Sequence, residues 1–101
     1  MLSKVEIIHT VQSVLAQHPY ILRAELFGSR QREDATADSD VDLLIQFDPD
    51  TRPKGIGLYA VEAELEEALG LPVEVVREEL LRDAVRQEIE TERELVYEKI
   101  S

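Results

Sequence analysis

The sequence predicts one small α/β or α+β domain in which helices pack on a mixed β-sheet. Segments with helical and strand-like hydrophobic patterns alternate along the chain, which is the order expected for helices layered on a sheet. The order is helix, strand, short helix, strand, helix, strand, helix and a last short apolar segment. A length of 101 residues suits one domain, so residues 1–101 are treated as a single unit.

The N-terminal part predicts a helix followed by a strand. Ser3 and Glu6 have the spacing of a capping box, which begins a helix, and Pro19 is expected to end it. The apolar stripe predicted on this helix consists of Val5, Ile8, Val11 or Gln12, and Leu15. Residues 20–27 then alternate as a strand does. The alternation predicts one face with Leu22, Ala24 and Leu26, and another with Ile21, Arg23, Glu25 and Phe27.

The middle of the chain predicts a second strand at residues 41–47. A short helix at residues 29–32 and a loop at residues 33–39 lead into it. Residues 48–55 contain two prolines and a glycine, so they are expected to form a loop. Lys54 in this loop either approaches a nucleotide or is an ordinary solvated lysine.

The last third of the chain predicts helix, strand and helix. Apolar residues recur at helical spacing over residues 58–69, and Gly70 is well placed just past the helix end. The strand is expected at residues 72–76. The last helix is defined by Leu80, Leu81, Val85 and Ile89, with i,i+4 charge pairs Glu78–Arg82 and Arg86–Glu90. Residues 95–97 are either a short fourth strand or a continuation of that helix.

A pair of aspartates at the start of the second strand is the first candidate for chemistry. Side chains at positions i and i+2 of a strand share a face, with Cα atoms roughly 6.5 Å apart. Asp40 and Asp42 can therefore point together at one cation or a pair of cations. A carboxylate pair beside an apolar run is unfavourable unless a metal or hydrogen-bond donors compensate it. The alternative is a turn aspartate followed by a solvated strand residue.

Gly28 and Ser29 follow the first strand and strengthen the functional interpretation. Glycine lets the backbone approach a ligand closely, and amides at a turn or helix start favour phosphate oxygens. Arg30 is either a ligand for phosphate or for a partner carboxylate, or a solubilising residue of the loop; the same alternatives hold for Arg32. The segment therefore predicts a phosphate site beside a metal site.

The stretch GSRQREDATADSDVDLL resembles the Gly-Ser…Ser-Asp-x-Asp-Leu signature of the DNA polymerase β-like nucleotidyltransferase superfamily. More narrowly, the chain is similar to minimal nucleotidyltransferases (MNT), the antitoxins encoded beside HEPN-domain proteins. Gly28, Ser29, Asp40 and Asp42 match the motif position by position, and Ser39 matches its frame. Two positions depart from the pattern. Glu33 stands where related proteins often carry glycine, and Glu74 stands where a third carboxylate, usually aspartate, completes the catalytic set.

The resemblance implies a fold, an activity and a site. The fold is the polymerase β-like nucleotidyltransferase core. The activity is transfer of AMP from ATP to a tyrosine of a HEPN-type toxin with release of pyrophosphate, supported by Mg²⁺, two ions being expected. The residues implied are Asp40, Asp42 and Glu74 as metal ligands and catalytic residues, and Gly28, Ser29, Arg30 and Ser39 at the nucleotide.

Position 74 leaves alternatives open. If the strand at residues 72–76 lies beside the second strand, Glu74 faces Asp40 and Asp42; otherwise it is an ordinary edge-strand glutamate. A second alternative for the function is a catalytically degenerate acidic module that neutralises a HEPN-type partner by binding alone, which Glu74 and the large acidic excess favour. A third alternative is a nucleotidyltransferase that acts on a small molecule.

The composition limits the kinds of partner that this chain can bind. A formal net charge of −11 argues against direct binding of nucleic acid, because non-specific affinity for it comes largely from lysine and arginine. A basic protein partner, in a joint oligomer with this chain, or a metal-bound nucleotide is easier to accommodate. The sequence has no cysteine, no secretory signal and no apolar run long enough for a membrane span, so we expect a cytoplasmic protein.

Overall fold

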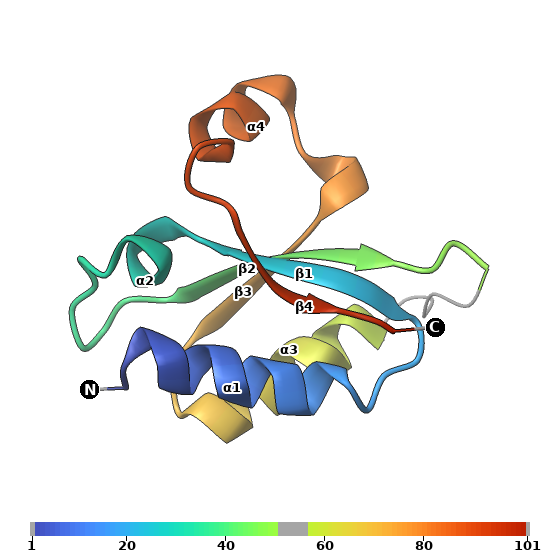
Figure 1. Ribbon diagram of the computed structural model, residues 1–101, viewed down its shortest axis with the longest axis horizontal. Coiled ribbons are helices and arrows are strands. Elements are labelled where there is room, and N and C mark those ends of the chain that lie inside the picture. The colour runs from blue at the N-terminus through green and yellow to red at the C-terminus, as the bar shows by residue number, and fades with distance from the viewer. Residues whose placement is uncertain (1, 51–56, 101) are drawn as a thin grey trace.

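The computed structural model describes residues 2–50 and 57–100, which form a four-stranded sheet with helices on both faces (Figure 1). The predicted loop at residues 48–55, with Lys54, lies largely outside the described residues. The elements in chain order are α1 (Lys4–Leu15), β1 (Ile21–Phe27), α2 (Gly28–Arg32), β2 (Val41–Phe47), α3 (Gly57–Leu69), β3 (Val73–Arg77), the 3-10 turn η1 (Glu78–Leu80), α4 (Asp83–Ile89) and β4 (Glu94–Glu98).

The sheet is mixed, as predicted. Its strand order is β3-β2-β1-β4, in which β1 is antiparallel to both β2 and β4, and β2 is parallel to β3. Helix α3 makes the crossover that a parallel pair requires. Figure 1 shows α1 and α3 on one side of the sheet and α4 on the other. The face of the sheet opposite α1 and α3 is therefore not occupied by the main core, and the candidate site lies on that face.

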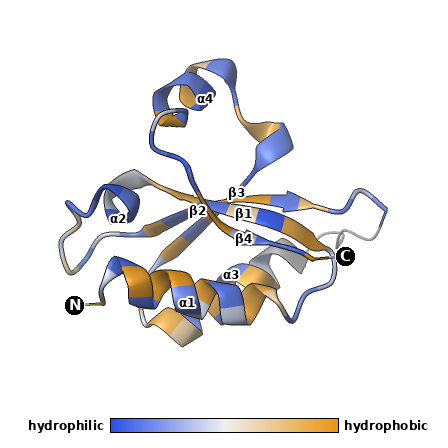
Figure 2. Ribbon diagram, viewed as in Figure 1, coloured by the Kyte–Doolittle hydropathy of each residue, from blue (hydrophilic) through white to orange (hydrophobic). Residues whose placement is uncertain are grey.

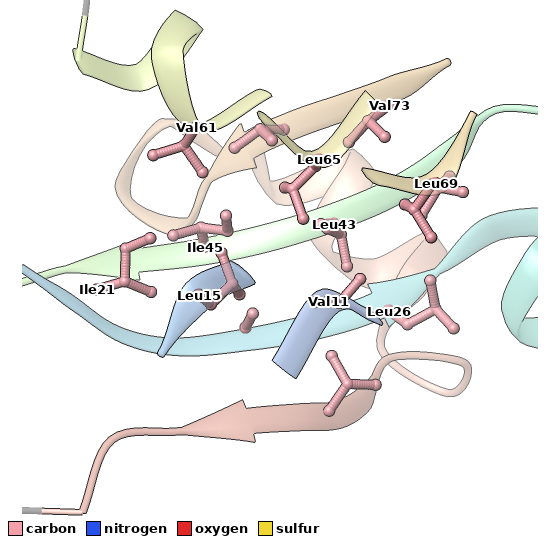
Figure 3. Packing of buried hydrophobic residues seen from close by; sticks show 14 of the residues in the cluster. Val11, Leu15, Ile21, Leu26, Leu43, Ile45, Val61, Leu65, Leu69 and Val73 are labelled. Atoms are coloured by element: carbon pink, nitrogen blue, oxygen red, sulfur yellow. The ribbon is translucent and has the colours of Figure 1, made fainter. Parts of the chain in front are cut away.

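The core lies between the sheet and the helices α1 and α3 (Figure 3). Each helix contributes one buried stripe at i,i+4 spacing, and the strands contribute alternate residues. The helix residues are Ile7, Val11, Leu15, Val61, Leu65 and Leu69; the strand residues include Ile21, Ala24, Leu26, Leu43, Ile45 and Val73. Figure 2 shows hydrophobic and hydrophilic residues alternating along α1, as expected for a helix that covers a core with one side only.

The stripe predicted on α1 is wrong at its first turns. Val5 is 61% exposed, and the buried stripe begins at Ile7, because the i,i+4 series through Ile7 is the one that faces the sheet. The capping box of Ser3 and Glu6 is confirmed by two reciprocal hydrogen bonds of 3.1 Å. The helix ends at Leu15, earlier than Pro19 requires, since hydrogen-bonded turns already reverse the chain before the proline.

The faces predicted for β1 are wrong at its N-terminal end. Ile21 is fully buried, whereas Leu22 is only partly buried. The pairing with β2 shifts register between Ile21 and Arg23, and such a bulge moves the residues before it to the other face. From Arg23 onward the prediction is correct, with Ala24 and Leu26 facing the core.

The C-terminal part differs from the predicted helix. Leu80 lies in the 3-10 turn and is 66% exposed, and α4 begins only at Asp83, so the apolar residues there do not form one helical stripe. The predicted i,i+4 charge pairs are replaced by pairs that converge on Arg93. The segment at residues 95–97 is a strand, not a helix, because β4 pairs with β1. No helix within residues 2–50 and 57–100 has the length and hydropathy that a bilayer span requires.

Candidate active site

Three carboxylates meet where β2 and β3 lie side by side. Asp40 precedes β2, Asp42 is its second residue, and Glu74 is directly opposite Asp42 in the parallel pairing. One carboxylate oxygen from each of the three lies within 4.8 Å of the other two. The structure thus brings together the three residues predicted as metal ligands.

Strand alternation explains why these side chains share a face. Val41, Leu43 and Ile45 are fully buried toward the helices, so the intervening Asp42 points to the opposite face of the sheet. On β3, Val73 and Val75 are buried in the same way, and Glu74 points outward. The apolar pattern that makes the core therefore also places the carboxylates.

The cluster changes the acidity of its middle member. Burial, followed by the negative charges of Glu74 and Asp40, raises the pKa of Asp42 from 3.8 to about 6. A hydrogen bond with Glu74 and the charge of Glu92 act in the same direction. The site therefore holds more negative charge than it can solvate well. Three carboxylates in this state fit a hard divalent cation such as Mg²⁺, which prefers oxygen ligands.

Gly28 allows the chain to pass directly over Asp42. Its backbone has φ of 76°, a left-handed conformation that side chains rarely adopt. A Cβ atom at this position would collide with the Asp42 carboxylate and lie 3.2 Å from its Cγ. Because Phe27 pairs with Asp42 across β1 and β2, this close approach is built into the register. Only glycine permits both features together.

Arg30 and Ser39 brace the loop that leads to Asp40. Arg30 is 3% exposed, and its guanidinium Nη2 donates to the Ser39 carbonyl at 2.9 Å. The Ser39 hydroxyl accepts a 2.9 Å hydrogen bond from the Thr36 N–H. Ser29 lies partly buried at the start of α2, and its carbonyl accepts from the Asp34 N–H at 3.1 Å. Arg30 thus holds the backbone of Ser39, the residue directly before Asp40.

Glu33 occupies the position where the resembling family often carries glycine, and the backbone shows the reason. Its φ of 63° is the left-handed value, and it forms the C-cap of α2. Among the described residues it is the one side-chain-bearing residue with positive φ. Glycine adopts this conformation without the steric penalty of a Cβ atom, so this departure affects the local backbone and not the carboxylates.

Sequence reasoning missed one carboxylate beside this site. Glu92 lies in the turn between α4 and β4, and its Oε1 accepts from the Gly28 N–H at 3.1 Å. Its Oε2 accepts from the Arg32 guanidinium at 2.8 Å. No local pattern connects Glu92 to the Gly-Ser motif, 64 positions away, so only the fold reveals the contact.

A cavity of about 560 Å³ opens on the same face of the sheet as Asp42, although none of the three carboxylates lines it. Leu44 and Gln46, which follow Asp42 on that face of β2, line it together with charged residues. Arg93 crosses it with a bidentate pair to Glu25, at 2.7 and 2.9 Å, and a further pair to Glu78 at 3.0 Å. This network fastens the turn between α4 and β4 to β1 and to the 3-10 turn η1.

Comparison with known proteins places this geometry in a family. Residues 9–101 match the family described as polymerase beta nucleotidyltransferase. The chain belongs to this family. It is also 33% identical over 94 residues to the protein adenylyltransferase MntA of Thermococcus cleftensis, a match that covers 86% of this chain and 91% of the relative.

Solved structures of the same fold include MNT antitoxins. A toxin-antitoxin crystallised with AMP-PNP superposes with a TM-score of 0.76 at 20% identity, covering 91% of this chain and 73% of the other. The MNT antitoxin bound to a tri-AMPylated HEPN toxin of Shewanella oneidensis gives 0.70 at 18% identity, covering 95% and 73%. The polymerase β-like fold implied by the motif is thereby confirmed, as is the recognition of a minimal nucleotidyltransferase.

Proposed function

We propose that this chain is an antitoxin that transfers AMP from ATP to a tyrosine of a HEPN-domain partner. The observation that carries the proposal is the convergence of Asp40, Asp42 and Glu74 within 4.8 Å on one face of the sheet, beside Gly28. The adenylyltransferase named as a relative supports the reaction class. The HEPN complex of a structural neighbour supports the kind of partner.

The residues have separate roles in this proposal. Asp40, Asp42 and Glu74 would hold Mg²⁺, which when bound offsets the charge of the phosphates and polarises the reacting phosphorus. The Gly28 amide and the Ser29 hydroxyl would contact the β and γ phosphates. Arg30, together with Ser39, would act on the nucleotide indirectly, by holding the loop that carries the aspartates.

In the proposed transfer, one bond to the α-phosphorus of ATP forms and one breaks. The tyrosine hydroxyl oxygen attacks the α-phosphorus and forms a new oxygen–phosphorus bond, and the bond from that phosphorus to the oxygen bridging to the β-phosphate breaks. Pyrophosphate leaves with that bond's electron pair. The hydroxyl proton passes to a carboxylate of the site. Glu74 is the candidate for this role, because its side chain is exposed and accessible to the acceptor. The partner contributes the acceptor tyrosine.

Labelling of the partner tests the proposal. The proposed HEPN-domain partner is incubated with this chain and ATP labelled at the α-phosphate, with Mg²⁺ or with a chelator. We expect incorporation with the parent and Mg²⁺, none with chelator, and none with Asp42→Asn. Asp38→Asn, the same change in the loop before the site, serves as the control and should label normally. Stable complex formation with no incorporation by the parent would instead favour neutralisation by binding alone.

A further inference from the structure

Glu92 bridges two hydrogen-bond donors at the edge of the carboxylate cluster. One donor is the Gly28 N–H at 3.1 Å and the other is the Arg32 guanidinium at 2.8 Å. The Glu92 side chain is 19% exposed, so it is largely surrounded by protein but still reached by solvent. Arg32 is about half exposed and also pairs with Asp34 at 3.1 Å. The carboxylate thus satisfies both donors beside the proposed phosphate position.

The fold holds Glu92 in this place. The Glu92 and Arg93 N–H groups both donate to the Ile89 carbonyl, at 3.0 and 2.9 Å, which makes a tight turn after α4. The next side chain, Arg93, is fixed to Glu25 on β1 by its bidentate pair. Glu92 is therefore directed at Gly28 by anchors on both sides and is not a freely rotating surface residue.

The donors that Glu92 engages are of the types that bind phosphate. Backbone N–H groups and arginine guanidinium groups donate hydrogen bonds to carboxylate oxygens and to phosphate oxygens alike. A phosphate that reaches the Gly28 N–H must therefore displace the Glu92 oxygen.

We infer that Glu92 competes with the phosphate groups of the nucleotide for the Gly28 N–H and the Arg32 guanidinium. The inference rests on the proposed function, because it assigns the competitor for that site. Glu92 then determines which anions enter: a ligand must supply enough negative charge to displace a carboxylate and to recruit Arg32. Triphosphates meet this requirement better than monophosphates, so Glu92 favours the substrate over a nucleoside monophosphate.

Glu92→Gln separates charge from shape. The substitution keeps an oxygen acceptor for the Gly28 N–H and the size of the side chain, but it removes the negative charge and weakens the hold on Arg32. Inorganic tripolyphosphate should therefore bind about three- to tenfold more tightly to Glu92→Gln than to the parent. Adding Arg32→Gln to this variant should remove part of the gain, since the released guanidinium is then missing.

The matched control is Glu90→Gln, which removes the same charge two residues earlier. Glu90 is 64% exposed on its side chain and pairs with Arg93 at 3.4 Å, not with the donors at the site. Its tripolyphosphate affinity should equal that of the parent. If Glu90→Gln tightens binding as much as Glu92→Gln does, the effect is one of overall charge and the inference is overturned.

The experiment is calorimetric titration of the full chain and these variants with tripolyphosphate in the presence of Mg²⁺, which offsets the charge of the carboxylate cluster, at two salt concentrations. Urea unfolding of each variant establishes that it is folded. Equal or weaker binding by Glu92→Gln, or no binding by any variant, overturns the inference. Failure of the proposed function has a different signature. The tripolyphosphate affinities would then change as expected, but no AMP would be incorporated into the partner at saturating ATP and Mg²⁺.

Discussion

Asp42→Asn should stabilise the metal-free protein at alkaline pH, although Asp42 is proposed as a metal ligand. In the folded protein the pKa of Asp42 is about 6, above its ordinary value of 3.8. Folding therefore favours the protonated form, and the ionised form destabilises the fold. This penalty is absent below pH 3.8, develops as the pH rises toward 6, and is complete above it. Replacing the carboxylate with an amide removes the penalty.

The magnitude follows from the difference between the two pKa values. A gap of about two pH units corresponds to ~3 kcal/mol for a fully buried group. Asp42 is only half-buried, and screening by solvent reduces the expected gain to ~1–2 kcal/mol. For a domain of this size, each kcal/mol raises the melting temperature by ~4–8 °C. The introduced amide also keeps a donor for Glu74, to which protonated Asp42 hydrogen-bonds.

The assay is urea unfolding of parent, Asp42→Asn and Asp38→Asn at pH 4 and pH 8, with chelator present. We expect Asp42→Asn to be the more stable protein at pH 8 only, and the control to follow the parent at both values. Saturating Mg²⁺ should narrow the difference by stabilising the parent. Asp42→Asn less stable than the parent at pH 8 would refute the reasoning that this carboxylate is held in an unfavourable charged state.

Three further predictions concern the backbone and the ion pairs. Gly28→Ala should lower the free energy of unfolding by ~2–4 kcal/mol, because alanine disfavours positive φ and its Cβ would collide with Asp42. Gly70→Ala has a similar φ but open space around the Cβ, so it should lower it by only ~1 kcal/mol. Equal losses of the two variants in urea unfolding would contradict the collision. Glu33→Gly should gain ~1 kcal/mol, because it relieves a left-handed residue, and a measured loss would show that its side chain matters more. Arg93→Gln should lose ~2 kcal/mol in the same assay, because it removes the nearest cation from Glu25 and from Glu78 and leaves them only longer pairs with Arg23 and Arg86. An unchanged urea midpoint would show that the network is not stabilising.

The sequence was sufficient to predict the layers of the fold and the three carboxylates. Alternation in residues 41–47 and 72–76 determines which side chains are buried, and the buried ones force Asp42 and Glu74 to the other face. The assignment of Glu74 depended on β3 lying beside β2. A short sequence cannot predict that adjacency from its own pattern, and here the motif supplied it.

The errors have physical causes that local patterns do not contain. The bulge near Ile21 is a property of the pairing between β1 and β2, so it is invisible in the alternation of one strand. The contacts of Glu92 with Gly28 and of Arg93 with Glu25 join residues more than 60 positions apart, and charge patterns resolve only neighbours on a helix. Residues 95–97 were too few for periodicity to separate strand from helix.

The most direct test of the central claim is AMP incorporation into the partner by parent, Glu74→Gln and Glu74→Asp, with Mg²⁺ and with chelator. Glutamate extends one methylene farther than the usual aspartate, and a displacement of ~1 Å can reduce a positioned reaction ~100-fold. Because Glu74 lies within 4.8 Å of both aspartates, we expect Glu74→Gln to reduce turnover sharply and Glu74→Asp to retain or raise it. Turnover by Glu74→Gln equal to that of the parent would contradict a three-carboxylate site and leave Asp40 and Asp42 as the two remaining candidate metal ligands.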